Sequence, residues 1–306
     1  MRLRKPFKTA VLVLIWGWIL LLVLVPNLLV IVTSFLTRDD THFIRWPATM
    51  ENYLRLFDPG YLAVFGHSLY MAVVTTLLCL LIGYPFAYLL SRLRDSLKPY
   101  LLFLVIVPFW TNSLVRTYAM KLLISTNGLV NQALLSLGWI DTPLRMLYTE
   151  AAVIAGLFYI LLPFMILPLY AVFEQLRPDL LEASSDLGAD RWKTFRRVVL
   201  PLTLPGIIAG CLLVLLPAVG MFYVADVLGG AKNLLIGNVI KNQFLDARDW
   251  PFGAATSLLL TLAMGILLYA YYLSVKPVSY THLRAHETSR AISYAVFCLK
   301  KGGGGG

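Results

Sequence analysis

The polar side chains that could do chemistry in this chain are few, and they lie in or beside apolar runs. Asp226 follows Tyr223 by three residues near the end of one run. Trp110 and Asn112 form a second polar and aromatic cluster in another run. A carboxylate can hold an amine by charge, and an aromatic ring adds about 0.5 to 2 kcal/mol through a cation–π contact. These four residues are candidates for a cation-binding path; the alternative is a solvated Asp226 beside an aromatic belt at the membrane interface.

The longest strongly charged interval between two apolar runs is the segment 179–201, DLLEASSDLGADRWKTFRRVVLP. Asp179 follows a proline and precedes Glu182 by three residues, which predicts a helix capped by Asp179, with Glu182 reaching back to its first turn. Gly188 can adopt the left-handed conformation that ends such a helix, and Asp190 can cap a second one. The pattern predicts two short amphipathic helices with a glycine hinge; the alternative is a solvated loop.

Signatures of enzymes are missing from the sequence. It contains no G-x-x-x-x-G-K-[ST] phosphate-binding loop, no H-E-x-x-H and no G-x-S-x-G. The three cysteines are an odd number and indicate no disulfide framework. His282 and His286 are one helical turn apart, but they lie in a C-terminal stretch that we exclude below. We therefore expect no catalytic residues, no metal site and no cofactor.

The composition predicts a membrane protein. Of the 306 residues 59% are hydrophobic and only 14% are charged, with a mean hydropathy of +0.75. The apolar runs predict an all-α polytopic protein with six transmembrane helices, and the net charge of +10 is explained by basic residues flanking these runs rather than by nucleic acid. The six expected spans are residues 10–35, 68–90, 100–116, 151–173, 204–228 and 251–275.

The distribution of Lys and Arg predicts the orientation. The basic residues before the first run place the N-terminus in the cytoplasm, and the proposed inner loops carry more Lys and Arg than the longer outer ones. With six spans, both termini and the 179–201 segment are cytoplasmic. Arg116, at the end of the third run, is expected to snorkel outward.

The character of the sequence changes at residue 277. The stretch 277–306, PVSYTHLRAHETSRAISYAVFCLKKGGGGG, has no spanning run and ends in five glycines. Its SYTHLRAHETS string resembles translated sequencing-adapter read-through, and the alternative is a flexible cytoplasmic tail. We interpret 1–276 as the transmembrane domain and 277–306 as a non-native tail, which we leave out of the functional argument.

The 179–201 segment closely resembles the EAA signature of permease subunits of binding-protein-dependent ABC importers, E-A-A-x3-G-x9-I-x-L-P. Glu182, Ala183 and Gly188 match in type and spacing. The departures are Ser184 for the second alanine and Val198 for isoleucine. In that family, which has the type I importer permease fold, this loop docks on a separate ATPase. The resemblance thus implies an ATPase-coupling role for Asp179, Glu182, Ala183, Gly188 and Trp192.

Further stretches resemble the permeases of spermidine/putrescine importers, namely VRTYA at 115–119, LPF at 162–164 and DWP at 249–251. This resemblance implies a non-catalytic subunit of a polyamine importer in the bacterial inner membrane. Its partners would be a paralogous second permease, two ATP-binding subunits, a periplasmic substrate-binding protein and membrane lipid. A substrate path would form between the two permeases. An importer of another small solute, a self-sufficient secondary carrier and a membrane-embedded enzyme are the alternatives; the last would need a catalytic pair that the sequence lacks.

Overall fold

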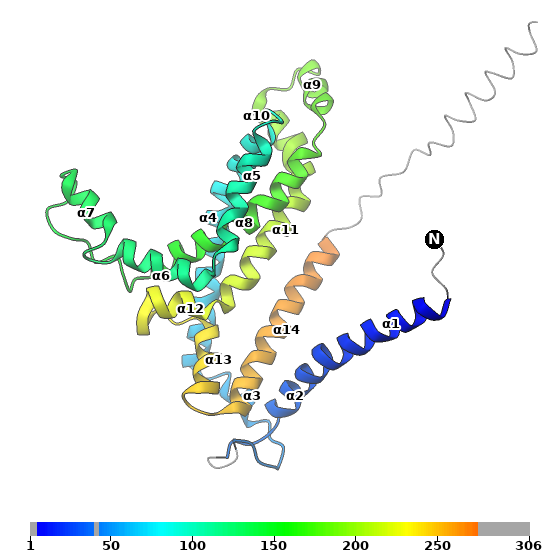
Figure 1. The fold of residues 1–306 in the computed structure, drawn as a ribbon, viewed down its shortest axis with the longest axis vertical. Coiled ribbons are helices and arrows are strands. Elements are labelled where there is room, and N and C mark those ends of the chain that lie inside the picture. The colour runs from blue at the N-terminus through cyan, green and yellow to red at the C-terminus, as the bar shows by residue number, and fades with distance from the viewer. Residues whose placement is uncertain (1–4, 40–42, 275–306) are drawn as a thin grey trace, which may run out of the picture. The chain divides into compact units, whose positions relative to one another are not determined.

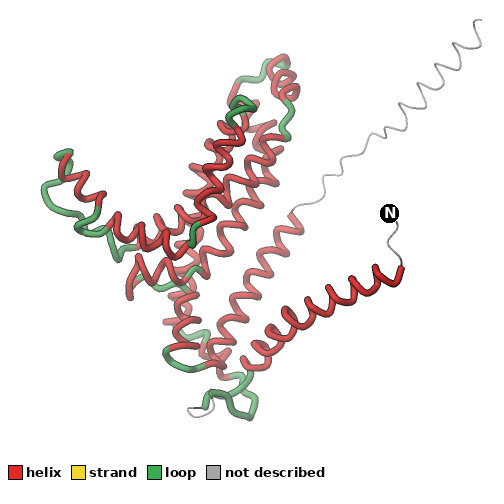
Figure 2. The backbone as a smooth tube through the Cα atoms, viewed as in Figure 1, coloured by secondary structure: helices red, strands yellow, loops and turns green. Residues whose placement is uncertain are grey.

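The computed structural model describes residues 5–39 and 43–274, and within these ranges it contains helices but no strand (Figures 1 and 2). The chain divides into two units, residues 1–266 and 267–306. Of the second unit, only 267–274, the end of the last helix, is described. The proposed tail at 277–306 lies outside the described residues.

Five helical segments of the described chain are long and apolar enough to cross a membrane, and a bent pair could supply a sixth. In chain order they are α1 (Lys5–Ile19), η1 (Leu20–Leu24) and α2 (Val25–Ser34) in series; α4 (Pro59–Ser91); α8 (Glu150–Glu174); α10 (Arg191–Thr194), η3 (Phe195–Val199) and α11 (Leu200–Gly220) in series; and α14 (Trp250–Ser274). This arrangement agrees with the expected membrane-spanning pattern, except that α4 begins at Pro59 rather than at residue 68, the third span is bent and the fifth has other bounds.

The third expected span is broken. α5 (Lys98–Ile106) and the 3-10 turn η2 (Val107–Trp110) end at an extended residue, Thr111. The chain then turns by 94° into α6 (Ser113–Ile124), which α7 (Leu129–Ser136) follows. The prediction of a continuous span to Arg116 was therefore wrong, because Asn112 starts a new helix by accepting a hydrogen bond from the backbone N–H of Leu114 at 2.8 Å.

The fifth expected span starts earlier and ends earlier than the sequence indicated. One continuous helical segment runs from Arg191 to Gly220 and contains Pro201, Pro205 and Pro217. The π-helical turn η3 ends two residues before Pro201, where the backbone must accommodate a residue without an N–H. The helix stops at Met221, whose ψ is 68°, so the following residues belong to a separate short segment.

Helices α4, α8 and α11 pack against one another and form the core (Figure 1). Met165 of α8 is fully buried at their junction. A Cβ atom added to Gly83 of α4 would lie 3.1 Å from the Met165 Cγ, and one added to Gly210 of α11 would lie 2.6 Å from its Sδ. Small residues on two helices thus admit one large side chain of the third, as is usual for close helix packing in membranes.

The short helices α3 (Glu51–Arg55) and α13 (Ile236–Leu245) flank the start of α14. Arg55 Nη1 forms an ion pair with Asp249 Oδ2 at 2.8 Å, and its guanidinium lies 4.2 Å from the centre of the Phe252 ring. Asp249 also accepts a hydrogen bond from the Phe252 backbone at 3.2 Å. Asp249 therefore both caps α14 and ties it to a segment almost 200 residues earlier in the chain.

Candidate functional site

The predicted glycine hinge in the 179–201 segment is present. The first helix is α9 (Pro178–Asp186), and Gly188, two residues after its end, has a φ of +77°. The Gly188 N–H donates to the Ser185 carbonyl at 2.9 Å, and the Ala189 N–H donates to the Ser184 carbonyl at 3.1 Å. This is the Schellman arrangement, in which a left-handed residue closes the last turn of a helix. A residue with a side chain would be strained at Gly188.

Asp190 caps the next helix, α10, as the sequence indicated. Its Oδ1 accepts a hydrogen bond from the Lys193 backbone N–H at 2.7 Å, and this bond holds the pKa of the Asp190 carboxyl below its usual value. The hydroxyls of Ser184 and Thr194 lie 2.8 Å apart and join the two helices. Ser184, the departure from the alanine of the signature, thus makes a contact that alanine could not make.

Asp179 does not cap α9, and this prediction was wrong. Pro178 occupies the first helical position and Arg177 the capping position, so Asp179 lies in the first turn. Its Oδ2 accepts a hydrogen bond from Arg177 Nη2 at 2.6 Å, and this guanidinium lowers the pKa of the carboxyl. A carboxylate there is still favourable, because the helix N-terminus carries a partial positive charge.

Several side chains of the two helices, some of them apolar, are exposed. Leu181 and Ser184 face the protein, whereas Leu187 is 88% exposed and Trp192 is 68% exposed. Glu182 and Ala183 are exposed as well. The hinge therefore presents two large apolar side chains and a carboxylate to the surroundings of the chain.

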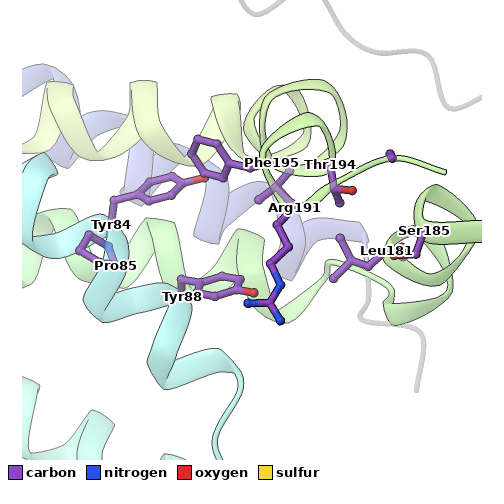
Figure 3. Close-up of a pocket in the computed structure, with 10 residues that line it drawn as sticks. Tyr84, Pro85, Tyr88, Leu181, Ser185, Arg191, Thr194 and Phe195 are labelled. Atoms are coloured by element: carbon purple, nitrogen blue, oxygen red, sulfur yellow. Dashed lines mark hydrogen bonds between the residues drawn. The ribbon is translucent and has the colours of Figure 1, made fainter.

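Behind the hinge lies a pocket of about 590 Å³, called here the Tyr84 pocket. It is lined by Tyr84, Pro85, Tyr88, Leu181, Ser185, Ala189, Arg191, Thr194, Phe195 and Val199. Figure 3 shows Tyr84 pointing toward Phe195, and the two ring centres are 6.1 Å apart. The Tyr84 hydroxyl lies 3.0 Å from that of Thr203 on α11. An aromatic contact therefore joins Phe195, after the hinge, to Tyr84 of α4, and a hydroxyl contact joins Tyr84 to α11.

Three of the four candidate cation-binding residues line a second pocket, of about 570 Å³, called here the Trp110 pocket. Its walls are Phe109, Trp110, Thr111, Asn112, Ser113, Arg116, Ile160, Phe164, Met221 and Tyr223. The helix breaks at Thr111 and at Met221 bring these residues together. Trp110 is 74% exposed. The side-chain oxygen of Asn112 is engaged as the cap of α6.

Arg116 also lines the Trp110 pocket, and the prediction that it snorkels outward was wrong. Only 9% of Arg116 is exposed. Its Nε and Nη1 atoms are buried and form no hydrogen bond within the described residues. The Phe109 and Tyr159 ring centres each lie 5.9 Å from its Cζ atom. Two cation–π contacts of about 0.5 to 2 kcal/mol each offset only part of the several kcal/mol that burying an unpaired charge costs.

Asp226, the fourth candidate, is not among the residues that line the Trp110 pocket. It lies in η4 (Ala225–Gly229), beyond the short helix α12 (Phe222–Val224), and not in the fifth span as expected. Asn238 Nδ2 donates to its Oδ1 at 2.5 Å, and Lys241 Nζ donates to its Oδ2 at 2.7 Å. A 3-10 turn, η5 (Gly230–Lys232), separates η4 from the loop that leads to α13. The negative charge of Asp226 is therefore balanced within the chain.

The sequence analysis did not find Asn238 or Lys241. Both lie on α13, three residues apart, so they share one face of that helix. Their spacing of three residues, in the segment between the fifth and sixth apolar runs, was the signal in the sequence that could have pointed to them. In residues 5–39 and 43–274, no cluster of three or more His, Cys, Asp or Glu side chains could hold a metal ion.

Comparisons with known proteins agree with this architecture. Residues 79–277 match the family described as "Binding-protein-dependent transport system inner membrane component". The spermidine/putrescine transport system permease protein PotB of Escherichia coli K12 is 60% identical over 260 residues, which cover 85% of this chain and 94% of that protein. The protein of the same description from Haemophilus influenzae is 55% identical over 270 residues, 88% of this chain and 94% of that protein.

The fold is shared with solved importer structures. The chain aligns with one from the crystal structure of a bacterial ABC transporter involved in the import of the acidic polysaccharide alginate. The TM-score is 0.73 at 17% identity, over 90% of this chain and 97% of that one. At this identity the likeness concerns the fold alone, and it confirms the expected polytopic helical fold of an ABC importer permease. With more than half of its length matched by the family pattern, the chain belongs to the inner membrane components of binding-protein-dependent transport systems, multi-pass proteins of the inner membrane.

Proposed function

We propose that this chain is the permease subunit of an ATP-driven importer of polyamines such as spermidine and putrescine. The observation that carries the proposal is the 55 to 60% identity to permeases described as spermidine/putrescine transport proteins, over nearly the whole length of those proteins. The chain would hydrolyse no ATP itself. It would work with a paralogous permease, two ATP-binding subunits and a periplasmic binding protein.

Coupling to the ATPase is assigned to the hinge at Gly188. Leu187 and Trp192 are large, exposed and apolar, and Glu182 beside them adds a charge. Exposed aromatic and aliphatic anchors of this kind dominate the energetics of protein interfaces. A movement of the ATPase would reach the core through Phe195, which packs on Tyr84 and is part of the helix that continues into α11.

The solute path is assigned to the region of the two helix breaks. Tyr223 and Trp110 line the Trp110 pocket and offer aromatic faces to an amine. Asp226 would take part by exchanging Lys241 for a substrate ammonium, since both are cationic donors to the same carboxylate. A dication could then be passed from the carboxylate to the rings as the transporter changes state.

The assembly and its orientation belong to the same proposal. In the isolated chain, the apolar helix at Val11–Ser34 has no buried residue in its most hydrophobic stretch, a surface available to lipid and to a second permease. Both termini and the Gly188 hinge would lie in the cytoplasm, where an ATPase can bind. The basic residues before the first helix support this orientation.

Reconstituted transport tests the proposal. The chain, its co-encoded permease and ATPase would be purified together, placed in liposomes, and supplied with the binding protein and radiolabelled spermidine. We expect uptake that requires ATP inside the vesicles and the binding protein outside. Uptake by the chain alone, driven by an ion gradient, would instead identify a secondary carrier.

A second candidate, an importer of a small anion, is favoured by one observation. The Trp110 pocket contains the buried guanidinium of Arg116, and a basic group in a solute path attracts anions. In the same liposomes, competition of unlabelled sulfate or molybdate with spermidine separates the two. We expect no competition from either anion.

A further inference from the structure

The guanidinium of Arg116 lacks a partner that the described chain could supply. Its Nε and Nη1 atoms are buried without a hydrogen bond, and no carboxylate of residues 5–39 or 43–274 forms an ion pair with it. Nε and Nη1 point to different edges of the planar guanidinium, and the charged acceptor that best matches an arginine in a protein is a carboxylate. The two nitrogen atoms without partners therefore point to an acceptor, foremost a carboxylate, that is absent from the isolated chain.

The neighbouring carboxylate of this chain is already engaged. Asp226 follows directly on the pocket-lining segment at Tyr223, but Asn238 binds its Oδ1 and Lys241 binds its Oδ2. Moving it to Arg116 would leave Lys241 without its anion. The partner of Arg116 must then come from outside this chain, from the solute, a lipid headgroup or another subunit.

The inference rests on the proposed function, which excludes the solute. A polyamine is a polycation and is repelled by a guanidinium, most strongly where water is scarce. An uncompensated Arg116 in the pocket wall would thus oppose the transport that we propose. Of the proposed partners, the second permease is the one that would share the solute path with this chain.

We propose that Arg116 binds a carboxylate side chain of the second permease subunit at the Trp110 pocket. The pocket holds about 570 Å³ and is bordered by the exposed ring of Trp110, so a side chain of another subunit can enter beside Asn112 and Ser113. The pair fixes the register between the two permeases. It also removes a positive charge from the path of a cationic solute.

Carbodiimide cross-linking of the assembled importer tests this pair. The Arg116→Lys variant places an amine in the pocket, and a membrane-soluble carbodiimide joins that amine to an adjacent carboxylate as an amide while the reagent takes up the water and becomes a urea. We expect a covalent product of the two permeases, with the linked peptide containing position 116. Arg116→Gln is the matched control, because it lacks the amine but keeps the native Lys121 on the same helix.

A second measurement is needed in case the lysine side chain of the Arg116→Lys variant is too short to reach the partner carboxylate. Removing the charge with Arg116→Gln leaves the partner carboxylate buried and unpaired, so we expect the second permease recovered with the tagged chain in mild detergent to fall by about 30-fold. Lys121→Gln, on the same helix but outside the Trp110 pocket, should retain the wild-type yield.

The outcomes separate this pair from the proposed function. If the wild-type complex imports polyamine, yet Arg116→Lys gives no product and Arg116→Gln keeps the full yield, the pair is overturned and the polyamine function stands. A product with the binding protein, and none with the second permease, also overturns it. If the wild-type complex imports an anion instead, both proposals fail, because the solute would supply the missing negative charge.

Discussion

Asp226 and Lys241 form an ion pair of 2.7 Å, and both side chains are about one-third exposed. A pair that water still reaches can be opened at modest cost, because exposed salt bridges contribute little to stability. Such a pair suits a carboxylate that alternates between a lysine and a substrate amine. It suits a permanent structural bridge less well.

The first prediction concerns this carboxylate. Asp226→Asn keeps the shape but removes the charge that attracts a polycation, so we expect the kcat/KM of spermidine uptake to fall by about tenfold or more. Lys241→Met is the control, because it removes the competing cation and leaves Asp226 intact. If both variants take up spermidine at the wild-type rate, neither residue is part of the path.

Asp190 gives a second prediction, on pH. Its pKa is lowered in the folded chain by the hydrogen bond from the Lys193 N–H, so its capping contribution is present above the usual aspartate pKa and is lost as the pH falls through the lowered value. Asp190→Ala should lower the apparent Tm of the purified chain by about 1 to 3 °C at neutral pH. The difference between variant and wild type should shrink as the pH falls below the usual aspartate pKa and through the lowered value. A difference that is unchanged at low pH would assign the effect to something other than the charged cap.

At the scale of elements, the hinge requires glycine at position 188 because of its backbone conformation and not because neighbouring atoms leave no room for a side chain. A Cβ atom at Gly188 would meet nothing within 4 Å, but the φ of +77° disfavours any L side chain, by about 1 to 2 kcal/mol. The position of α10 relative to α9 therefore depends on glycine for conformational reasons.

The third prediction follows from this geometry. Gly188→Val should alter the hinge and lower the amount of spermidine imported per ATP hydrolysed, while the chain still inserts into the membrane. Gly188→Asn is the matched control, since asparagine tolerates the left-handed conformation. Both quantities are measured in the reconstituted liposomes. Equal coupling ratios for the two variants would argue against a role of the hinge in coupling.

Local chemistry in the sequence was sufficient for some elements and not for others. Gly188 and Asp190 were placed correctly because a left-handed glycine and a capping aspartate act through backbone groups only a few residues away. The breaks at Thr111 and Met221 were missed because hydropathy continues across them. The pairing of Asp226 with Lys241 was missed for a related reason. The sequence placed Asp226 inside the fifth span, whereas the helix ends at Gly220 and Asp226 lies in a separate segment that contacts α13.

At the scale of the molecule, one polar contact joins distant parts of the chain. Asp249 is 1% exposed and its charge is balanced by Arg55, which is partly exposed. Burial makes such a carboxylate costly to leave alone, whereas a pair of apolar residues can replace the two charges at little cost.

The fourth prediction uses this contact. Arg55→Met should destabilise the chain by about 3 kcal/mol, somewhat less than the full cost of breaking a buried pair because Arg55 is partly exposed. The double variant Arg55→Met with Asp249→Leu should recover most of that loss. Thermal unfolding in detergent, followed by tryptophan fluorescence, measures both. If the double variant is as unstable as the sum of the two single variants, the two residues are not coupled.

The helical segment from Arg191 to Gly220, which includes the π-helical turn η3, is long enough to work as a lever arm. Its 30 residues span about 45 Å, so tilting it by about 10° at one end displaces the other end by about 8 Å. One end carries Trp192 of the hinge, and the other ends directly before Met221 and Tyr223 of the Trp110 pocket. With the ATPase bound at the hinge, as proposed above, a displacement of a few ångströms there would reach the pocket through this helical segment without passing through a loop, so the two ends would move together.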